Sequence, residues 1–120
     1  MEERLRFIKY KDKEILLVHL DQATKQEMLD LLVSVQDTVT EHPRGSVLIL
    51  ADFCGAHIDK DIATRMKEVL VFDRPYVKRA AWVGAENIPA VFLENFKSFS
   101  RRDFPTFNTR EEAMEWLVAA

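Results

Sequence analysis

The hydrophobic positions of this chain recur at two different spacings, and each change of spacing marks a new segment. Imperfect alternation over residues 4–9 and the apolar run 15–20 flank the polar residues 11–13, which predicts a β-hairpin whose first strand lies at a sheet edge. Thr24 and Glu27 then form a capping box, which begins a helix. The apolar positions of that helix share one face: Met28, Leu31, Leu32, Val35 and Val39.

The middle of the chain predicts a central strand followed by a second helix. Pro43 and Gly45 end the first helix, and residues 47–51 form an unbroken apolar run that is typical of a parallel strand covered on both faces. Asp59 or Asp61 can cap the second helix. The inward positions of that helix are Ile62, Met66, Val69 and Leu70.

The last third repeats the alternation of strand and helix. Residues 80–83 predict a strand that closes at Gly84, and Asn87 precedes the start of a third helix. That helix has apolar positions at Ile88, Phe92, Phe96 and Phe99. Residues 104–107 predict a short last strand.

A terminal helix completes the order ββαβαβαβα. Thr109 and Glu112 repeat the capping-box pattern, and the apolar stripe that follows is Ala113, Trp116, Leu117 and Ala120. A hairpin followed by repeated helix–strand units requires a mixed, mostly parallel sheet with helices packed on it. We therefore predict one α/β domain over residues 1–120.

Composition narrows the classes of partner. The 120 residues are 48% hydrophobic and 31% charged, which is enough for one buried core. The net charge is −3, with both signs interleaved, so we expect no nucleic-acid partner. No apolar run approaches the roughly 18 residues of a membrane span, and no hydrophobic signal segment follows Met1. Together with a single cysteine, Cys54, these features predict a cytoplasmic protein that does not span a membrane.

Three stretches of the sequence carry a resemblance to a known family. They are residues 47–53, residues 80–84 and residues 107–117, and the resemblance extends over nearly the whole chain. In these features the chain resembles the SpoIIAA-like family, the STAS-type relatives of bacterial anti-sigma factor antagonists. The resemblance implies a single STAS-like domain that binds a partner.

The family's switch residue has no counterpart here. In the better-understood antagonists, the loop after the third strand carries a serine whose phosphorylation changes partner binding. The matching residues 52–57 contain no hydroxyl, and the nearest one downstream, Thr64, lies in the predicted second helix. We therefore predict a non-enzymatic binding or regulatory module that recognises a protein partner or a small apolar ligand near this loop.

The residues expected to form that binding site lie in or beside the loop, where the strand order places the carboxyl end of a parallel strand. They are Asp52, Phe53, Cys54, Gly55, His57 and Asp59. An alternative is a small thiol-dependent enzyme in which the imidazole of His57 activates Cys54. Asp59 and Asp61 fit a helix N-terminus better than a metal site, so we expect no metal and no cofactor.

A second candidate is an apolar pocket lined by Phe92, Phe96 and Phe99. Some relatives in the family are likened to lipid carriers, and a lipid carrier would need such a pocket. Packing against the core is the simpler explanation of that spacing. A homodimer is possible through the first strand, although Arg4, Arg6 and Lys9 are also typical of a protected edge.

Overall fold

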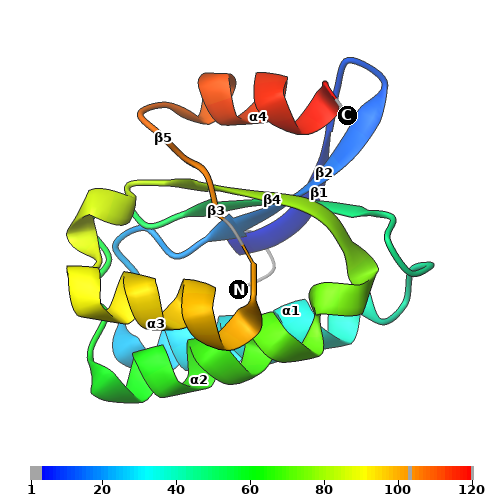
Figure 1. Cartoon of the computed structure of the whole chain (residues 1–120). Coiled ribbons are helices and arrows are strands. Elements are labelled where there is room, and N and C mark those ends of the chain that lie inside the picture. Colours follow the sequence, from blue (N-terminus) through cyan, green and yellow to red (C-terminus); the bar gives the residue numbers. More distant parts are fainter. Residues whose placement is uncertain (1–3, 103, 120) are drawn as a thin grey trace.

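A computed structural model of the chain describes residues 4–102 and 104–119 (Figure 1). Short 3-10 turns, η2 (Arg74–Tyr76) and η3 (Ala85–Asn87), flank the fourth strand. The strands and helices follow the predicted order: β1 (Leu5–Tyr10), β2 (Lys13–His19), α1 (Lys25–Val39), β3 (Val47–Asp52), α2 (Lys60–Phe72), β4 (Val77–Val83), α3 (Ala90–Ser100), β5 (Thr106–Phe107) and α4 (Arg110–Val118).

The sheet is mixed and mostly parallel, as predicted. Its strands lie in the order β1-β2-β3-β4-β5. β1 pairs with β2 in antiparallel fashion and lies at the edge, whereas the β2–β3, β3–β4 and β4–β5 pairs are parallel. All six residues of β3 are buried, which confirms the central strand expected from its unbroken apolar run.

Helices cover the two faces of the sheet unequally. Figure 1 shows α1, α2 and α3 side by side under one face and α4 alone on the other. Because side chains alternate along a strand, Ile49 and Ala51 enter the larger core beneath α1–α3, whereas Leu48 and Leu50 enter the smaller core under α4. Every inward residue predicted for α1 and α2 is buried.

The helix starts were predicted with mixed success. Both halves of the capping box at Thr24 are present, and Asp59, rather than Asp61, caps α2 by accepting from the N–H of Ile62. Thr109 accepts from the N–H of Glu112 at the start of α4. Asn87 was the wrong start for α3, because it lies in the turn η3 and the helix begins after Pro89.

Some predicted boundaries and faces also need correction. β4 begins at Val77 rather than at residue 80, and β5 is limited to Thr106–Phe107. Phe104 is instead buried, with its ring stacked on Trp82 at 4.5 Å. Phe99 is 60% exposed. Of the stripe predicted for α4, Ala113 and Leu117 are buried and Trp116 is half-buried, while Ala120 lies outside the described residues.

Candidate functional site

The loop after β3 contains both buried and exposed residues. Phe53, Ala56 and Ile58 are buried, and they anchor the segment in the larger core. Cys54, Gly55 and His57 lie between these anchors and are exposed. Three of the residues predicted for a binding site are therefore exposed in one short segment, which we call the β3 loop (residues 53–58).

Backbone and side-chain hydrogen bonds fix the β3 loop to its surroundings. The N–H of Phe53 donates to the carbonyl of Val83 at 2.8 Å, and Nδ2 of Asn87 donates to the carbonyl of Phe53 at 3.3 Å. Oδ1 of Asp52 accepts from the N–H of Cys54 at 2.9 Å. The start of the loop is thus hydrogen-bonded to two neighbouring segments, the end of β4 and the turn η3.

Gly84 allows this close approach. Its φ of +77° lies in the left-handed region, and a Cβ at this position would lie 2.6 Å from the backbone N of Cys54. No real Cβ contact is that short, so a side chain here would push the β3 loop away from the end of β4.

A polar cluster lies beneath the loop at the carboxyl ends of β2 and β3. The guanidinium of Arg110, in the first turn of α4, donates from Nε to Oδ2 of Asp52 at 2.7 Å, and its Nη2 forms an ion pair with the same oxygen at 2.7 Å. Nη2 of Arg110 also lies 3.1 Å from Nδ1 of His19, which is 3.3 Å from Oδ1 of Asp21. Ionisable side chains from β2, the turn after it, β3 and α4 therefore meet at the base of the β3 loop.

Sequence reasoning identified Asp52 but missed His19, Asp21 and Arg110. His19 ends β2 directly opposite Asp52 in the parallel register, so the strand order contained a signal for this pair. Arg110 lies 58 residues beyond Asp52. The sequence holds no local signal for that contact.

The charge of Asp52 is stabilised where it lies. Burial opposes ionisation, but the hydrogen bond from the Cys54 N–H and the neighbouring Arg110 outweigh it, so the pKa of Asp52 is lower than usual. The same carboxylate acts in the opposite direction on the thiol. Hydrogen bonding to Asp52, partial burial and the negative charge of Asp52 raise the pKa of Cys54.

The thiol of Cys54 and the imidazole of His57 share no hydrogen bond in the described part of the chain. Cys54 and His57 are both exposed, and within residues 4–102 and 104–119 the hydrogen bonds of Cys54 lead to Asp52 and none joins it to His57. The group that the thiol meets is therefore an anion, which disfavours a thiolate.

An open cleft of about 530 Å³ lies beside the polar cluster, and it is lined by Arg4, Arg6, His19 and Asp21. Nη1 of Arg4 donates to the backbone carbonyls of His19 and Asp21, each at 3.0 Å. Nη2 of Arg6 lies 3.4 Å from Nε2 of His19. The side chains that line this open cleft carry charged and polar groups, and its arginines already contact the strand ends that they flank.

The acidic residues near the loop lie at the start of α2, where Asp59 caps the helix. Asp59 caps the helix through Oδ1 to the N–H of Ile62 at 2.9 Å, which helps to hold the pKa of Asp59 below its usual value. Lys25 binds both Asp59 and Asp61, at 3.2 and 2.7 Å. Among the described residues, no three His, Cys, Asp or Glu side chains are grouped in a way that could hold a metal ion.

The phenylalanines of α3 are spread over different environments. Phe92 and Phe96 line a groove of about 150 Å³ between α2 and α3, together with Lys60, Thr64 and other residues of both helices. Phe96 is fully buried. Phe99 is outside this groove, and the ammonium of Lys67 lies 5.2 Å from its ring centre.

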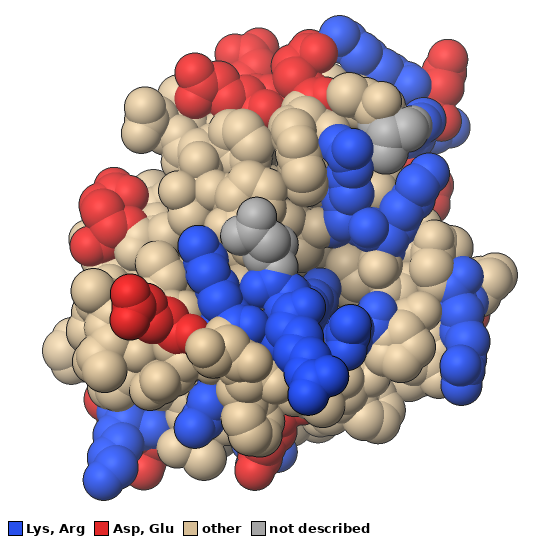
Figure 2. Space-filling model, in the orientation of Figure 1, with Lys and Arg blue, Asp and Glu red and all other residues tan. Residues whose placement is uncertain are grey.

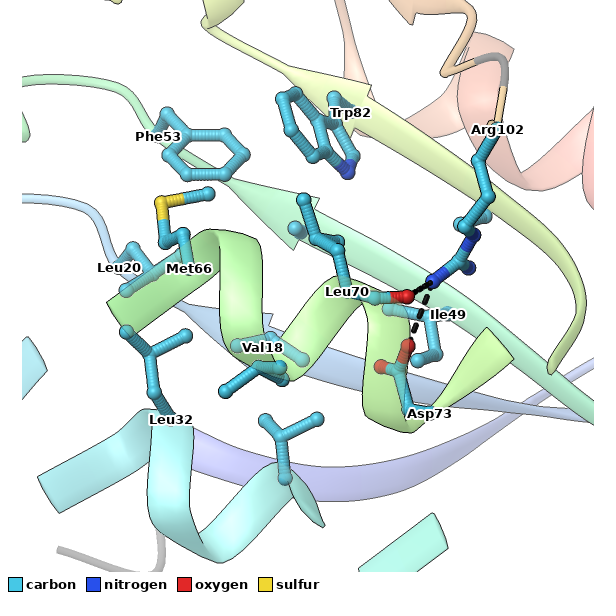
Figure 3. A pocket seen from close by; sticks show the side chains of 14 residues that line it. Val18, Leu20, Leu32, Ile49, Phe53, Met66, Leu70, Asp73, Trp82 and Arg102 are labelled. Carbon is cyan, nitrogen blue, oxygen red and sulfur yellow. Dashed lines mark hydrogen bonds and ion pairs between the residues drawn. The ribbon is translucent and has the colours of Figure 1, made fainter. Parts of the chain in front are cut away.

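The interior contains a small apolar cavity between the sheet and the helices α1 and α2 (Figure 3). Its volume is about 50 Å³, room for a few water molecules at most. Figure 3 shows Phe53, Met66 and Trp82 toward one end and the ion pair of Asp73 and Arg102 at the other. In its present form this cavity is far smaller than the sites of a few hundred Å³ that hold organic ligands.

Two further findings bear on what the chain could be. Within the described residues, none of the helices combines the length and the apolar character that a bilayer crossing requires. Comparisons with protein-family models, with curated proteins and with solved structures find no match to this chain.

Proposed function

We propose that this chain is a non-enzymatic, STAS-type binding or regulatory module that recognises a protein partner through the β3 loop. The observation that carries the proposal is the alternation of buried and exposed residues in that loop. The buried residues Phe53, Ala56 and Ile58 anchor the loop in the core, whereas Cys54, Gly55 and His57 are exposed to solvent. A loop ordered before binding loses little entropy on contact, which favours recognition of a partner.

The electrostatics of the loop support binding rather than thiol catalysis. A nucleophilic cysteine requires a lowered pKa, which a nearby cation or a helix N-terminus provides. Here the nearest charged partner of Cys54 is the Asp52 carboxylate, which raises the pKa of the thiol. The cation of the cluster, Arg110, is bound to Asp52.

A protein partner fits the site better than a small apolar ligand. The surface next to the loop is an open cleft with two arginines, a histidine and an aspartate, whereas the apolar cavity holds only about 50 Å³. Wide, partly polar surfaces around an exposed loop are typical of protein interfaces.

Site-specific photo-crosslinking in cells tests the proposal. We replace His57 with benzoylphenylalanine and compare it with the same replacement at Ser34, which is exposed on α1. We expect a discrete crosslinked protein from position 57 that is absent from position 34. Mass spectrometry then identifies the partner, and the purified pair allows the affinity to be measured.

The affinity measurement uses two variants with the same added charge. His57→Glu should weaken binding of that partner by about tenfold or more, because the substitution lies at the centre of the proposed interface. Ser34→Glu should change the affinity by less than about twofold. Equal effects of the two substitutions, or the lack of any crosslink specific to position 57, would show that the β3 loop is not the binding site.

A further inference from the structure

Strand β4 has an open edge along its first residues. β3 pairs with β4 over nearly its whole length, from Val77 to Val83. In the described part of the chain, β5 pairs with β4 at Trp82 and Val83. Residues 77–81 lie before this pairing begins, and their outer side is therefore a sheet edge.

Backbone groups at this edge point outward. The N–H of Trp82 donates to the carbonyl of Pro105 at 3.0 Å, on the β5 side of the strand. Because the backbone groups of a parallel strand alternate between its two neighbours, the N–H and C=O of Ala80 face the same side. Lys78 is the extra residue of a bulge, since Val47 is opposite Val77 and Leu48 is opposite Arg79.

A cleft of about 380 Å³ runs along this edge, and we call it the β4 cleft. Its lining includes Arg74, Lys78, Arg79, Ala80, Arg102 and Trp116. Two of its cations are committed within the protein. Arg79 donates to the carbonyl of Trp116 at 2.7 Å and lies 4.3 Å over that indole ring, and Arg102 is bound to Asp73. The side chains of these two arginines are therefore held by contacts within the protein, and they form two sides of the cleft.

The other two cations of the cleft are available. Arg74 and Lys78 are exposed, and within residues 4–102 and 104–119 no carboxylate forms an ion pair with either. Figure 2 shows Lys and Arg side chains gathered at the centre and right of this face, while most Asp and Glu side chains lie toward its margins. This face is basic although the chain as a whole carries a net charge of −3. An anionic partner would gain from that local potential.

We propose that the β4 cleft binds an acidic, extended peptide segment of a partner protein. The backbone of such a segment can pair with the outward N–H and C=O of Ala80, as in strand addition, while its carboxylates approach Arg74 and Lys78. Basic side chains and a bulge can also protect a sheet edge from pairing. The basic side chains, however, repel a basic strand and attract an acidic one. The free edge accommodates about four residues at roughly 3.3 Å each.

Charge and geometry favour a peptide over a nucleic acid. A phosphate backbone is held by many cations spread along its length, and among the described residues this cleft offers two uncommitted ones. The N–H and C=O of Ala80, which face the outer side of β4, match the donors and acceptors of another backbone. The inference does not depend on the β3 loop, because it concerns a different edge of the sheet.

Fluorescence anisotropy with a defined peptide tests this site. The probe is a fluorescein-labelled peptide of alternating Glu and Val, and its counterpart carries Gln in place of Glu. At low salt we expect the Glu peptide to bind at least about tenfold more tightly than the Gln peptide, with an affinity that falls as salt is added. Absence of binding, or equal binding of both peptides, overturns the proposal.

Two double variants with the same change of net charge locate the site. Arg74→Glu with Lys78→Glu should weaken binding of the Glu peptide by about tenfold or more. Lys9→Glu with Lys60→Glu, which are exposed elsewhere on the molecule, should weaken it by less than about twofold. Equal losses in the two double variants would mean general attraction and would overturn the assignment to the β4 cleft.

Amide hydrogen exchange separates backbone pairing from charge attraction alone. Binding of the Glu peptide should slow exchange of the Ala80 N–H, and it should leave the first residues of β1 unchanged. Binding without protection at Ala80 overturns strand pairing. Two further results overturn the choice of occupant: stronger competition by duplex DNA of equal charge, or a dimer of this chain that Arg74→Glu with Lys78→Glu dissociates.

Discussion

Asp52, at the end of β3, and Arg110, in the first turn of α4, join the sheet to the helix that covers its smaller core, through a hydrogen bond and an ion-pair contact of 2.7 Å each. Asp52 is 5% exposed, so its charge is costly without a partner. The same carboxylate accepts from the N–H of Cys54 and thereby shapes the β3 loop. One ion pair thus connects the docking of α4 with the conformation of the proposed binding loop.

Replacing Arg110 with Met should leave Asp52 unpaired. We expect the free energy of unfolding to fall by about 1–3 kcal/mol, less than for a fully buried pair because the arginine side chain is 35% exposed. Arg65→Met on the exposed side of α2 is the matched control, and it should cost less than about 0.5 kcal/mol. Urea unfolding of both variants measures the difference. Equal stabilities would show that the ion pair contributes nothing beyond a surface contact.

The two glycines at positions 84 and 45 offer a test of how the β3 loop is held. Both have positive φ, but a Cβ at Gly45 would meet nothing within 4 Å, whereas one at Gly84 would meet the backbone of Cys54. Gly45→Ala should therefore cost about 1 kcal/mol for its backbone conformation alone. Gly84→Ala should cost about 2–4 kcal/mol, because the contact with Cys54 adds to the same backbone term. A cost no larger than that of Gly45→Ala would mean that the loop moves freely away from β4.

Alkylation kinetics test the state of the thiol. Since the Asp52 carboxylate raises the pKa of Cys54, iodoacetamide at pH 7 should react with the folded protein more slowly than with a free-cysteine peptide. Asp52→Asn should speed the reaction, because it removes the negative charge, and circular dichroism confirms that the variant is folded. A rate faster than that of the peptide would instead favour the thiol-dependent enzyme that the sequence left open.

Local patterns were enough to predict much of the fold. α1 combines a capping box at Thr24 with a continuous apolar face, and β3 is an unbroken apolar run, so each has one simple explanation. Phe99 was expected on the inward face because its spacing places it beside Phe92 and Phe96, but it is 60% exposed. Spacing shows which residues share a face of a helix, and it does not show how far the core extends beneath that face.

The strand order of the sequence indicated where a candidate site could lie, but it did not indicate which distant residues would meet there. The β3 loop follows from the rule that sites lie at the carboxyl ends of parallel strands. Arg110 could not be predicted, since its contact with Asp52 exists only after β4, α3 and β5 have brought α4 over the sheet. Strand β5 was similarly misjudged, because the apolar character of Phe104 serves stacking on Trp82 rather than strand pairing.

The buried pair of Asp73 and Arg102 predicts a specific dependence of stability on pH. Asp73 is 2% exposed, and burial raises its pKa to about 6 against the opposing effect of Arg102. A carboxyl whose folded pKa exceeds its unfolded value of 3.8 binds its proton more tightly in the folded state. Its contribution to stability is therefore complete below about pH 4 and is lost as the pH rises through about 6.

Comparison with Asp73→Asn isolates this contribution, because the other carboxylates are common to both proteins. We measure urea unfolding of the two proteins at pH 4.5 and pH 7.5. From the lower to the higher pH, the variant should gain stability relative to the unsubstituted protein by up to about 3 kcal/mol, the upper bound that follows from a pKa displaced by about two units. A relative loss over the same interval would mean that Arg102 holds the carboxylate ionised, with a pKa below that of the unfolded chain.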